Sequence, residues 1–432
     1  MTDQHATVMG LGTFGGGAGA VRHLVNLGYD VTLTDAADER ALDRALEPIR
    51  DLIDSGSITL HLGGHNVSDF TTSELVIINP AVKHPWDNRF VRSAMAAGAR
   101  ITTEIGLFID AAPQNATIIG ITGSAGKSTT SAMVLAGLQA AHIPSVLGGN
   151  IGKSLLDQLD TLSDTSTIIL ELSSAMLWWL DQPGAIHRPT PLDIALVTNV
   201  EPNHIDWHGS AEHYTATKRS ILNRVKPQGR AVLHHSLSQW TAPKHIQSVQ
   251  YSDSFTANNI CIPGRHNRTN AAGALAACVA AGADPKRAAE GIAAFPGLPH
   301  RLEFIAERQG VRWYNDSKST TPRSTQLAVH ALQPAPIHLI VGGSDKGIDL
   351  HPIASLASDT CTLLCIGQTG AEIARLAGVQ PCATLDRAIA QAAAEAKPGG
   401  CVVLSPGCAS YDQFDNFEHR GRCFADLVRS LP

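Results

Sequence analysis

The 432-residue sequence lacks the features of a membrane, secreted or nucleic-acid-binding protein. No stretch reaches the roughly 18–20 consecutive apolar residues that a membrane span needs, and the polar start Met1–His5 is unlike a signal peptide. The eight cysteines include no CxxC pair, which argues against a disulfide framework or a structural zinc site. The formal net charge is -6 without a basic stripe, and nothing suggests a coiled coil or a swapped arm. We therefore expect a cytoplasmic monomer that binds small molecules, with no nucleic-acid or membrane partner.

Short apolar segments alternate with glycine turns and alanine-rich helical segments along the whole chain. The apolar segments do not alternate with polar residues, which is typical of parallel strands that are buried on both faces. Strands that alternate with helices predict α/β domains with mainly parallel sheets. The clearest strand predictions are 7–9, 31–34, 75–78, 117–122, 168–172, 194–199, 311–314, 337–341, 362–366 and 402–404.

Two proline-containing stretches predict domain boundaries. One is the polar stretch around Pro113, which precedes a new strand, and the other is the cluster of Pro296, Gly297 and Pro299. We therefore expect three α/β domains, at residues 1–112, 113–298 and 299–432. The segment from about 228 to 263 contains short strand-like pieces, and its sequence predicts no role.

The first glycine-rich loop has the spacing of a dinucleotide-binding fingerprint. Gly10-Leu-Gly12-Thr13-Phe14-Gly15 follows a predicted strand and opens a predicted helix, and Asp35 ends the next strand about 20 residues later. Such glycines let backbone N–H groups approach a diphosphate at a helix N-terminus, and the aspartate can accept hydrogen bonds from a sugar. A tight turn without a ligand is the alternative. The loop does not distinguish NAD, FAD and a UDP-sugar as its ligand.

The second glycine-rich loop, at residues 123–129, is close to the Walker A pattern. It lies between the predicted strand 117–122 and an alanine-rich helix, and Gly123 replaces the glycine that the strict pattern would place at Ile121. Backbone amides would face the phosphates of ATP, Lys127 would contact the β and γ groups, and Ser128 would reach Mg²⁺. A Gly-Lys-Ser-Thr run in this context predicts ATP binding rather than a chance glycine turn.

Polar residues at the ends of two further strands are candidates for binding metal and substrate. Glu171 ends one buried strand, and Asn199, Glu201, His204 and Asp206 follow another. Because the carboxyl ends of parallel strands meet at one edge of a sheet, we expect these groups near the ATP loop.

Lys218 lies in a helical segment after this set. A single helical lysine is usually a surface charge, so the residue pattern alone predicts an exposed side chain.

The third predicted domain has four polar clusters at strand ends, near positions 300, 316, 345 and 408. Arg301 and Lys318 are suitable partners for a transferred phosphoryl group, and Lys346 and Ser410 for a carboxylate. An ordinary α/β domain with capped helices would also account for these residues.

Several of these motifs, in this order, resemble the Mur ligases of peptidoglycan precursor synthesis. The resemblance runs from Gly10 to about Leu427, and the tail is similar to the branch that adds D-glutamate. The motifs are Thr122-Gly-Ser-Ala-Gly-Lys-Ser-Thr129, Gly149-Asn-Ile-Gly152, Glu171-Leu-Ser-Ser174, Asn199-Val-Glu-Pro-Asn-His-Ile-Asp206, Gly264-Arg-His-Asn-Arg-Thr-Asn270, Pro299-His-Arg301, Asn315-Asp-Ser-Lys318 and Ser405-Pro-Gly-Cys-Ala-Ser-Tyr-Asp-Gln-Phe-Asp-Asn-Phe-Glu-His-Arg-Gly421.

The resemblance implies an ATP-dependent carboxylate–amine ligase that adds D-glutamate to UDP-N-acetylmuramoyl-L-alanine through an acyl phosphate. It also implies a Rossmann-like first domain that binds the UDP-sugar, a P-loop ATPase central domain, and a Rossmann-like third domain that binds the amino acid. ATP and Mg²⁺, at two sites, would be the cofactors.

The resemblance further implies roles for single residues. Lys127, His204, Lys218 and Arg301 would be catalytic, and Lys218 would be carbamylated. The ATP site would comprise Gly123, Ser124, Ala125, Gly126, Lys127, Ser128, Thr129, Asn267, Asn270, Arg301 and Asp316. Mg²⁺ ligands would be Ser128, Glu171, His204 and Lys218. The UDP-substrate would meet Gly12, Thr13, Phe14, Asp35, Ala81, Asn150 and His204, and glutamate would meet Lys318, Thr320, Lys346, Ser410 and Phe417.

Other functions remain open at the level of the sequence. The same chemistry can use L-glutamate or another amino acid, and a folylpolyglutamate-synthetase-like ligase would share the ATP loop and the lysine. An NAD-dependent oxidoreductase would use the first loop and Asp35 but would leave the ATP loop unexplained. A non-catalytic ATP-binding protein would keep Lys127 without needing Glu171, His204 and Lys218 together.

Overall fold

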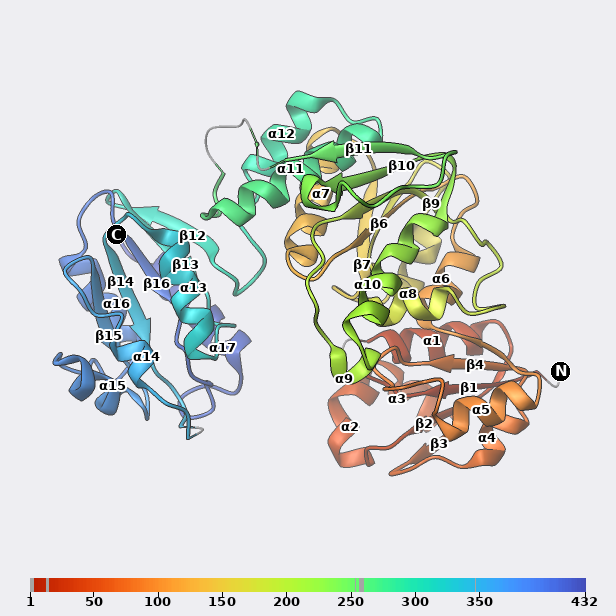
Figure 1. Cartoon of the computed structure of the whole chain (residues 1–432). Helices are drawn as coiled ribbons and strands as arrows, with labels where there is room; N and C mark the ends of the chain where they lie inside the picture. Colours follow the sequence, from red (N-terminus) through yellow and green to blue (C-terminus); the bar gives the residue numbers. More distant parts are fainter. Residues whose placement is uncertain (1–3, 13–14, 253, 256–259, 346) are drawn as a thin grey trace. The chain divides into compact units, whose positions relative to one another are not determined.

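The computed structural model describes residues 4–12, 15–252, 254–255, 260–345 and 347–432. Three sheets organise the chain, with helices packed against them (Figure 1), as the α/β pattern predicts. The chain divides into two units, Met1–Ser254 with Asn270–Ile292, and Phe255–Thr269 with Ala293–Pro432. Within the described ranges, no helix has both the length and the apolar character to cross a membrane.

The first sheet has the order β3-β2-β1-β4-β5, and all of its strand pairs are parallel. The strand order reverses at β1 and β4: β2 and β3 lie on one side of β1, whereas β4 and β5 lie on the other. The loops after β1 and β4 therefore diverge and leave a crevice at the carboxyl edge of the sheet. Its elements are β1 (His5–Met9), α1 (Gly16–Asn26), β2 (Asp30–Asp35), α2 (Glu39–Leu46), α3 (Arg50–Asp54), β3 (Ile58–Leu62), α4 (Val67–Thr71), β4 (Leu75–Ile78), α5 (Arg89–Ala96), β5 (Arg100–Thr102) and α6 (Glu104–Ala111).

The second sheet has the order β11-β10-β9-β6-β8-β7 and is also parallel throughout. The glycine loop of residues 123–126 joins β6 to α7, so it opens at the carboxyl edge of this sheet. The elements are β6 (Thr117–Thr122), α7 (Lys127–Ala140), β7 (Ser145–Gly149), η2 (Leu156–Thr161), β8 (Thr167–Glu171), α8 (Ser174–Leu180), β9 (Leu192–Val197), α9 (Ile205–His208), α10 (Ala211–Arg219), β10 (Val225–His234), β11 (Gln247–Tyr251), α11 (Arg265–Ala280) and α12 (Pro285–Ala293).

The first two sheets share one hydrophobic core. Val8 of β1 and Ile105 of α6 belong to the same buried cluster as Ile118 of β6 and Leu170 of β8. Ala112, at the predicted boundary between the first two domains, is buried in this cluster too. The carboxyl edges of both sheets are therefore held within one unit.

The third sheet has the order β12-β13-β16-β14-β15, in which β12 is antiparallel. Leu339 of β14 faces a core with α13, α14 and α15, whereas Ile340 faces a core with α16 and α17, so both sheet faces are covered. The elements are β12 (Glu303–Arg308), β13 (Val311–Asn315), α13 (Pro322–Leu332), β14 (Ile337–Val341), α14 (His351–Ala354), β15 (Cys361–Cys365), α15 (Gly370–Ala377), α16 (Leu385–Glu395), β16 (Cys401–Leu404) and α17 (Phe417–Arg429).

Every strand that the apolar runs predicted is present, with ends shifted by no more than a few residues. Strand β11 lies in the segment 228–263, where the sequence predicted only short pieces, and β10 begins just before this segment, at Val225. β7 was missed because it ends in two glycines, which weaken a strand pattern.

Candidate active site

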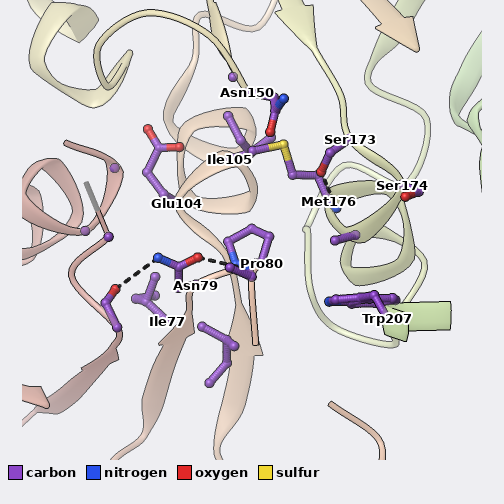
Figure 2. Close-up of a pocket in the computed structure, with 18 of the residues that line it drawn as sticks. Ile77, Asn79, Pro80, Glu104, Ile105, Asn150, Ser173, Ser174, Met176 and Trp207 are labelled. Carbon is purple, nitrogen blue, oxygen red and sulfur yellow. Dashed lines mark hydrogen bonds between the residues drawn. The ribbon is translucent and has the colours of Figure 1, made fainter. Parts of the chain in front are cut away.

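A cavity of about 460 Å³ lies between the carboxyl edges of the first two sheets. This volume is in the range of small-molecule sites. The loops after β1, β4, β7, β8 and β9 contribute to its wall, together with residues of α6 and α10 (Figure 2). The first glycine loop and Lys127, which directly follows the second glycine loop, therefore border one space although they are far apart in the sequence.

The first glycine loop folds closely around Asn79, which follows β4. Gly10 and Gly12 have φ values of 85° and 69°, and a Cβ on either would come within 3.0 Å of the Asn79 side chain, at 2.9 and 2.7 Å. Asn79 Oδ1 in turn accepts a hydrogen bond from the backbone of Ala81 at 2.9 Å, as Figure 2 shows. Only glycine fits at these two positions.

The residues predicted to bind the UDP-substrate are only partly gathered at the cavity. Gly12, Ala81, Asn150 and His204 line it. Asp35 is not among the lining residues: its carboxylate accepts hydrogen bonds from the backbone N–H groups of Leu11 at 2.8 Å and Ala37 at 2.9 Å. Asp35 therefore holds the loop in place. Thr13 and Phe14 lie outside the described residues.

The ATP loop has the conformation that its glycines allow. Gly123 and Gly126 have φ values of 153° and 80°. A Cβ on Gly123 would come within 1.9 Å of Thr198 Oγ1, and a Cβ on Gly126 within 2.4 Å of Asn270 Oδ1. Lys127 begins α7, and its Nζ donates hydrogen bonds to the backbone carbonyls of the loop, including Gly123 O at 2.9 Å. Asn270 thus lies against the loop.

Ser128 and Thr129 follow Lys127 in the first turn of α7. Backbone N–H groups in a first helical turn have no partner inside the helix, and the helix dipole favours an anion there. This position suits a phosphate group.

The loop after β9 supports the ATP loop through contacts that the sequence did not predict. Asn199 both accepts from Ala125 N and donates to Ala125 O, each at 3.0 Å. The Ser124 hydroxyl lies 2.8 Å from Tyr214 Oη, on α10, and the Glu201 backbone N–H donates to it at 2.8 Å. The side chains of Ser124 and Asn199 are therefore structural supports of the loop.

Glu171 is the buried carboxylate best suited to bind a metal ion. It ends β8, is 1% exposed, and its Oε1 accepts a hydrogen bond from Asn150 Nδ2 at 3.0 Å. Within the described part of the chain, Oε2 is buried without a hydrogen-bond partner. Burying a carboxylate oxygen without a hydrogen-bond donor costs free energy. Oε2 of Glu171 is therefore suited to be a ligand of a cation.

Lys218 is buried, not exposed, so the prediction from its helical position is wrong. Its side chain is 1% exposed, and its Nζ donates a hydrogen bond to Thr122 Oγ1 at 2.9 Å. Burial lowers the pKa of Lys218 well below its ordinary value, nearby Lys127 lowers it further, and Glu171 opposes both effects. α10 turns this residue toward the sheet, which a single lysine in a helical pattern does not reveal.

His204 lines the cavity with an exposed side chain and a left-handed backbone, at φ 50°. Such a conformation is uncommon for a residue with a Cβ and often marks a functional site. No group of three or more His, Cys, Asp or Glu side chains in the described ranges could hold a metal by itself.

Trp207 is a cavity residue that the motif analysis missed. It is 6% exposed, and among the described residues its Nε1 has no hydrogen-bond partner. Its ring packs edge-on against Trp86 and Trp178. In the sequence, Trp207 is marked only by its place directly after the motif that ends in Asp206. That place does not tell whether its side chain lines a cavity or packs in the core.

In the second unit, Asp316 is a buried structural carboxylate. It is 5% exposed and accepts hydrogen bonds from Leu302 N at 3.1 Å and from Ser405 Oγ at 2.7 Å. Burial raises the pKa of Asp316 to about 6, and hydrogen bonds from Ser319, Ser405 and Leu302 oppose this effect, as does the charge of Arg301. Arg301 is exposed and also lies near Lys318, whose pKa is lowered by burial and by Arg301.

Buried Arg420 connects the segments that carry three of the residues predicted to bind glutamate. Arg420 is 1% exposed and donates hydrogen bonds to the carbonyls of Ser317, Cys408 and Ala409. These carbonyls are next to Lys318 and Ser410 in the sequence, and Arg420 lies on the same helix as Phe417. The sequence showed Arg420 only as part of the tail motif.

The remaining predicted residues are placed one by one. The Lys318 Nζ lies 5.4 Å from the centre of the Phe417 ring. Thr320 is half-buried and precedes the N-cap of α13. Asn267 is 7% exposed and donates a hydrogen bond to Pro263 O at 2.6 Å. Lys346 lies outside the described residues.

Comparison with known proteins is consistent with this geometry. Residues 121–260 match the Mur ligase middle domain, and residues 300–408 match the glutamate ligase domain of the Mur ligases. Two similar proteins, from Symbiobacterium thermophilum and Roseiflexus sp., carry the name UDP-N-acetylmuramoylalanine--D-glutamate ligase. The first is 35% identical over 99% of this chain and 98% of its own, and the second 32% over 100% and 99%.

Solved structures share the fold. UDP-N-acetylmuramate-alanine ligase from Thermotoga maritima superposes with a TM-score of 0.55 at 17% identity, covering 99% of each chain. MurF from Acinetobacter baumannii gives a TM-score of 0.55 at 18% identity, over 79% of this chain and 88% of its own. Together with the sequence identity over nearly the full length, these matches show that the chain belongs to the Mur ligase family.

Proposed function

We propose that the protein joins D-glutamate to UDP-N-acetylmuramoyl-L-alanine at the expense of ATP, as a cytoplasmic monomer in peptidoglycan precursor synthesis. The observation that carries this proposal is the single cavity bordered by Gly12 of the first glycine loop, Lys127 of the ATP loop and buried Lys218. A sugar nucleotide and ATP bound to the two loops would bring a substrate carboxylate and a γ-phosphate together. The names of the relatives in this family support D-glutamate as the incoming amine.

Mg²⁺, when bound, would neutralise phosphate charge and polarise the reacting oxygens. Ser128 and Glu171 would hold one ion, and His204 and Lys218 a second. The buried Glu171 Oε2 without a donor supports the first site. The lowered pKa of Lys218, caused by burial and by Lys127, supports the second, since only the neutral amine reacts with CO₂ to form a carbamate and release a proton.

The residues of the chain would mainly position and polarise the reactants, because phosphoryl transfer needs little covalent help from the protein. Lys127 would exchange its bonds to loop carbonyls for the phosphates of ATP. The substrate carboxylate would attack the γ-phosphate, and the amine of glutamate would then displace phosphate from the acyl phosphate. The walls of the cavity would limit water near that intermediate.

The second unit would carry further residues that contact ATP and the residues that bind glutamate. Asn267, Arg301 and Asp316 would belong to the first set, and Lys318, Thr320, Lys346, Ser410 and Phe417 to the second. Among these, Asp316 would present its buried carboxylate to the ribose only if it gave up a backbone or hydroxyl donor. On this proposal residues 1–112 bind the UDP-sugar, 113–298 bind ATP and 299–432 bind the amino acid.

The test is phosphate release from ATP and Mg²⁺ with UDP-N-acetylmuramoyl-L-alanine and one of three additions: D-glutamate, L-glutamate or no amino acid. We expect release that depends on D-glutamate, together with a new amide product in mass spectrometry. Release with L-glutamate alone would keep the chemistry and reject the stereochemical assignment. Absence of release with every amino acid would reject the proposal.

A further inference from the structure

Glu104 lines the substrate cavity but belongs to none of the motifs. It is the first residue of α6, and its Oε1 accepts a hydrogen bond from Ser154 Oγ at 2.6 Å. Figure 2 shows Glu104 and Trp207 on opposite sides of the cavity. The side chain therefore lies on the wall that the first sheet contributes, away from the aromatic residues.

The carboxyl group of Glu104 borders the N-terminus of α1. Gly16 and Gly17 both line the cavity, and a Cβ on Gly16 would lie 3.9 Å from Glu104 Oε2. Gly17 is in contact with the first loop, because a Cβ there would meet Leu11 O at 2.3 Å. The N–H groups of this first turn are where a diphosphate is expected to bind. Oε2 is thus within reach of the same ligand.

A charged carboxylate at this position would repel a diphosphate, whereas a neutral carboxylic acid could donate a hydrogen bond to it. Burial raises the pKa of Glu104 to about 7. Asp157 raises it further, and the Ser154 hydroxyl and the Leu155 backbone N–H lower it. Near neutral pH both forms are present, and a bound diphosphate would favour the neutral one.

Among the residues that the structure describes, no cation pairs with Glu104. Asp157, on η2, is the charged residue that acts on it directly, and Arg22, on α1, acts on Asp157 and is hydrogen-bonded to Asp51. The other titratable side chains that line the cavity are Lys83, Lys127, Lys153, His204, Asp206, Tyr214 and Lys218.

We propose that Glu104 is a substrate-binding residue that, as a neutral acid, donates a hydrogen bond to a diphosphate oxygen of the UDP-substrate. This inference rests on the proposed function for the identity of the ligand. Its consequence is that binding takes up a proton when Glu104 starts out ionised. Affinity therefore falls as the pH rises above neutrality.

The experiment measures the Kd of UDP-N-acetylmuramoyl-L-alanine by titration calorimetry without ATP, from about pH 6 to about pH 9. Both phosphates of this ligand are esterified, so they do not titrate in this range. For the wild type we expect Kd to rise about tenfold for each pH unit above neutrality, with one proton taken up. For Glu104→Gln we expect a nearly constant Kd, because the amide donates at every pH and can still accept from Ser154.

Ser154→Ala is the matched control. It removes the hydrogen bond to Oε1 but leaves the acid, so its Kd should rise with pH as steeply as that of the wild type. The rise should begin at a higher pH, because the Ser154 hydroxyl lowers the pKa of Glu104. Equal pH profiles for the wild type and Glu104→Gln would overturn the inference, as would wild-type affinity of Glu104→Ala at about pH 6.

The outcomes for this inference and for the proposed function can be separated. A pH-dependent Kd without turnover would keep the role of Glu104 and reject the proposed reaction. If the protein turns over with D-glutamate but Glu104→Gln leaves the pH dependence of Kd unchanged, the proposed reaction is kept and the role of Glu104 is rejected.

Discussion

The amine of Lys218 lies 2.9 Å from Thr122 Oγ1 in a buried position between Lys127, which disfavours its protonation, and Glu171, which favours it. A buried amine without an ion-pair partner contributes little or nothing to stability. Its presence at this position is therefore better explained by chemistry than by folding.

We predict that Lys218→Met lowers D-glutamate-dependent phosphate release by at least about a hundredfold, since a metal ligand would be lost. The free energy of unfolding should stay within about 1 kcal/mol of the wild type or increase, because an apolar side chain replaces the buried amine. Urea unfolding and initial rates measure the two effects.

Lys226→Met is the control for this variant. Lys226 is only half-buried and pairs with Asp193 at 3.0 Å, outside the cavity. It should lose no more than about 1 kcal/mol of stability and keep its activity. Near-wild-type turnover of Lys218→Met would contradict the catalytic role.

At the scale of the element, the turn from β6 into α7 depends on Gly123. We predict that Gly123→Ala raises the KM for ATP at least about tenfold and costs more than about 2 kcal/mol of stability. The reason is that a Cβ would lie 1.9 Å from Thr198 Oγ1, which must move and lose its 2.7 Å bond to Ala125 O. Steady-state kinetics and urea unfolding measure the two effects.

Gly28→Ala separates backbone strain from the steric clash. Gly28 has a φ of 87°, but a Cβ there would meet no atom within 4 Å. This variant should lose about 1–2 kcal/mol without a change in the KM for ATP. If Gly123→Ala also leaves the KM unchanged, the clash with Thr198 does not govern ATP binding.

For the whole molecule, the core shared by Val8, Ile105, Ile118 and Leu170 predicts that the first two sheets unfold together. In scanning calorimetry, UDP-N-acetylmuramoyl-L-alanine and ADP should each shift the same transition upward. At about 100 times its Kd, each ligand should add about 2.7 kcal/mol to the stability of that unit. Two transitions, each shifted by only one ligand, would show instead that residues 1–112 and 113–298 unfold independently.

The local sequence determined the strands, the two glycine loops and the candidate residues at the strand ends. Buried parallel strands must be apolar on both faces, and Gly10, Gly12, Gly123 and Gly126 adopt backbone conformations that few other residues can. Such signals are contained within a few neighbouring residues, so one sequence is enough to read them. The resemblance to the Mur ligases then carried the assignment of roles, which composition and spacing did not supply.

Only the tertiary structure decided which of these residues lie close together, and whether each side chain is buried or exposed. In the folded chain Lys218 is buried, and Asp35 holds the first glycine loop in place. Glu104 lies beside Gly16, which is far from it in the sequence. Burial and long-range contacts depend on how helices such as α6 and α10 pack onto the sheets, and the same local pattern is compatible with an exposed or a buried side chain. The pKa values of Lys218 and Glu104 follow from that packing, because the free energy of a charge depends on the solvent and charges that surround it.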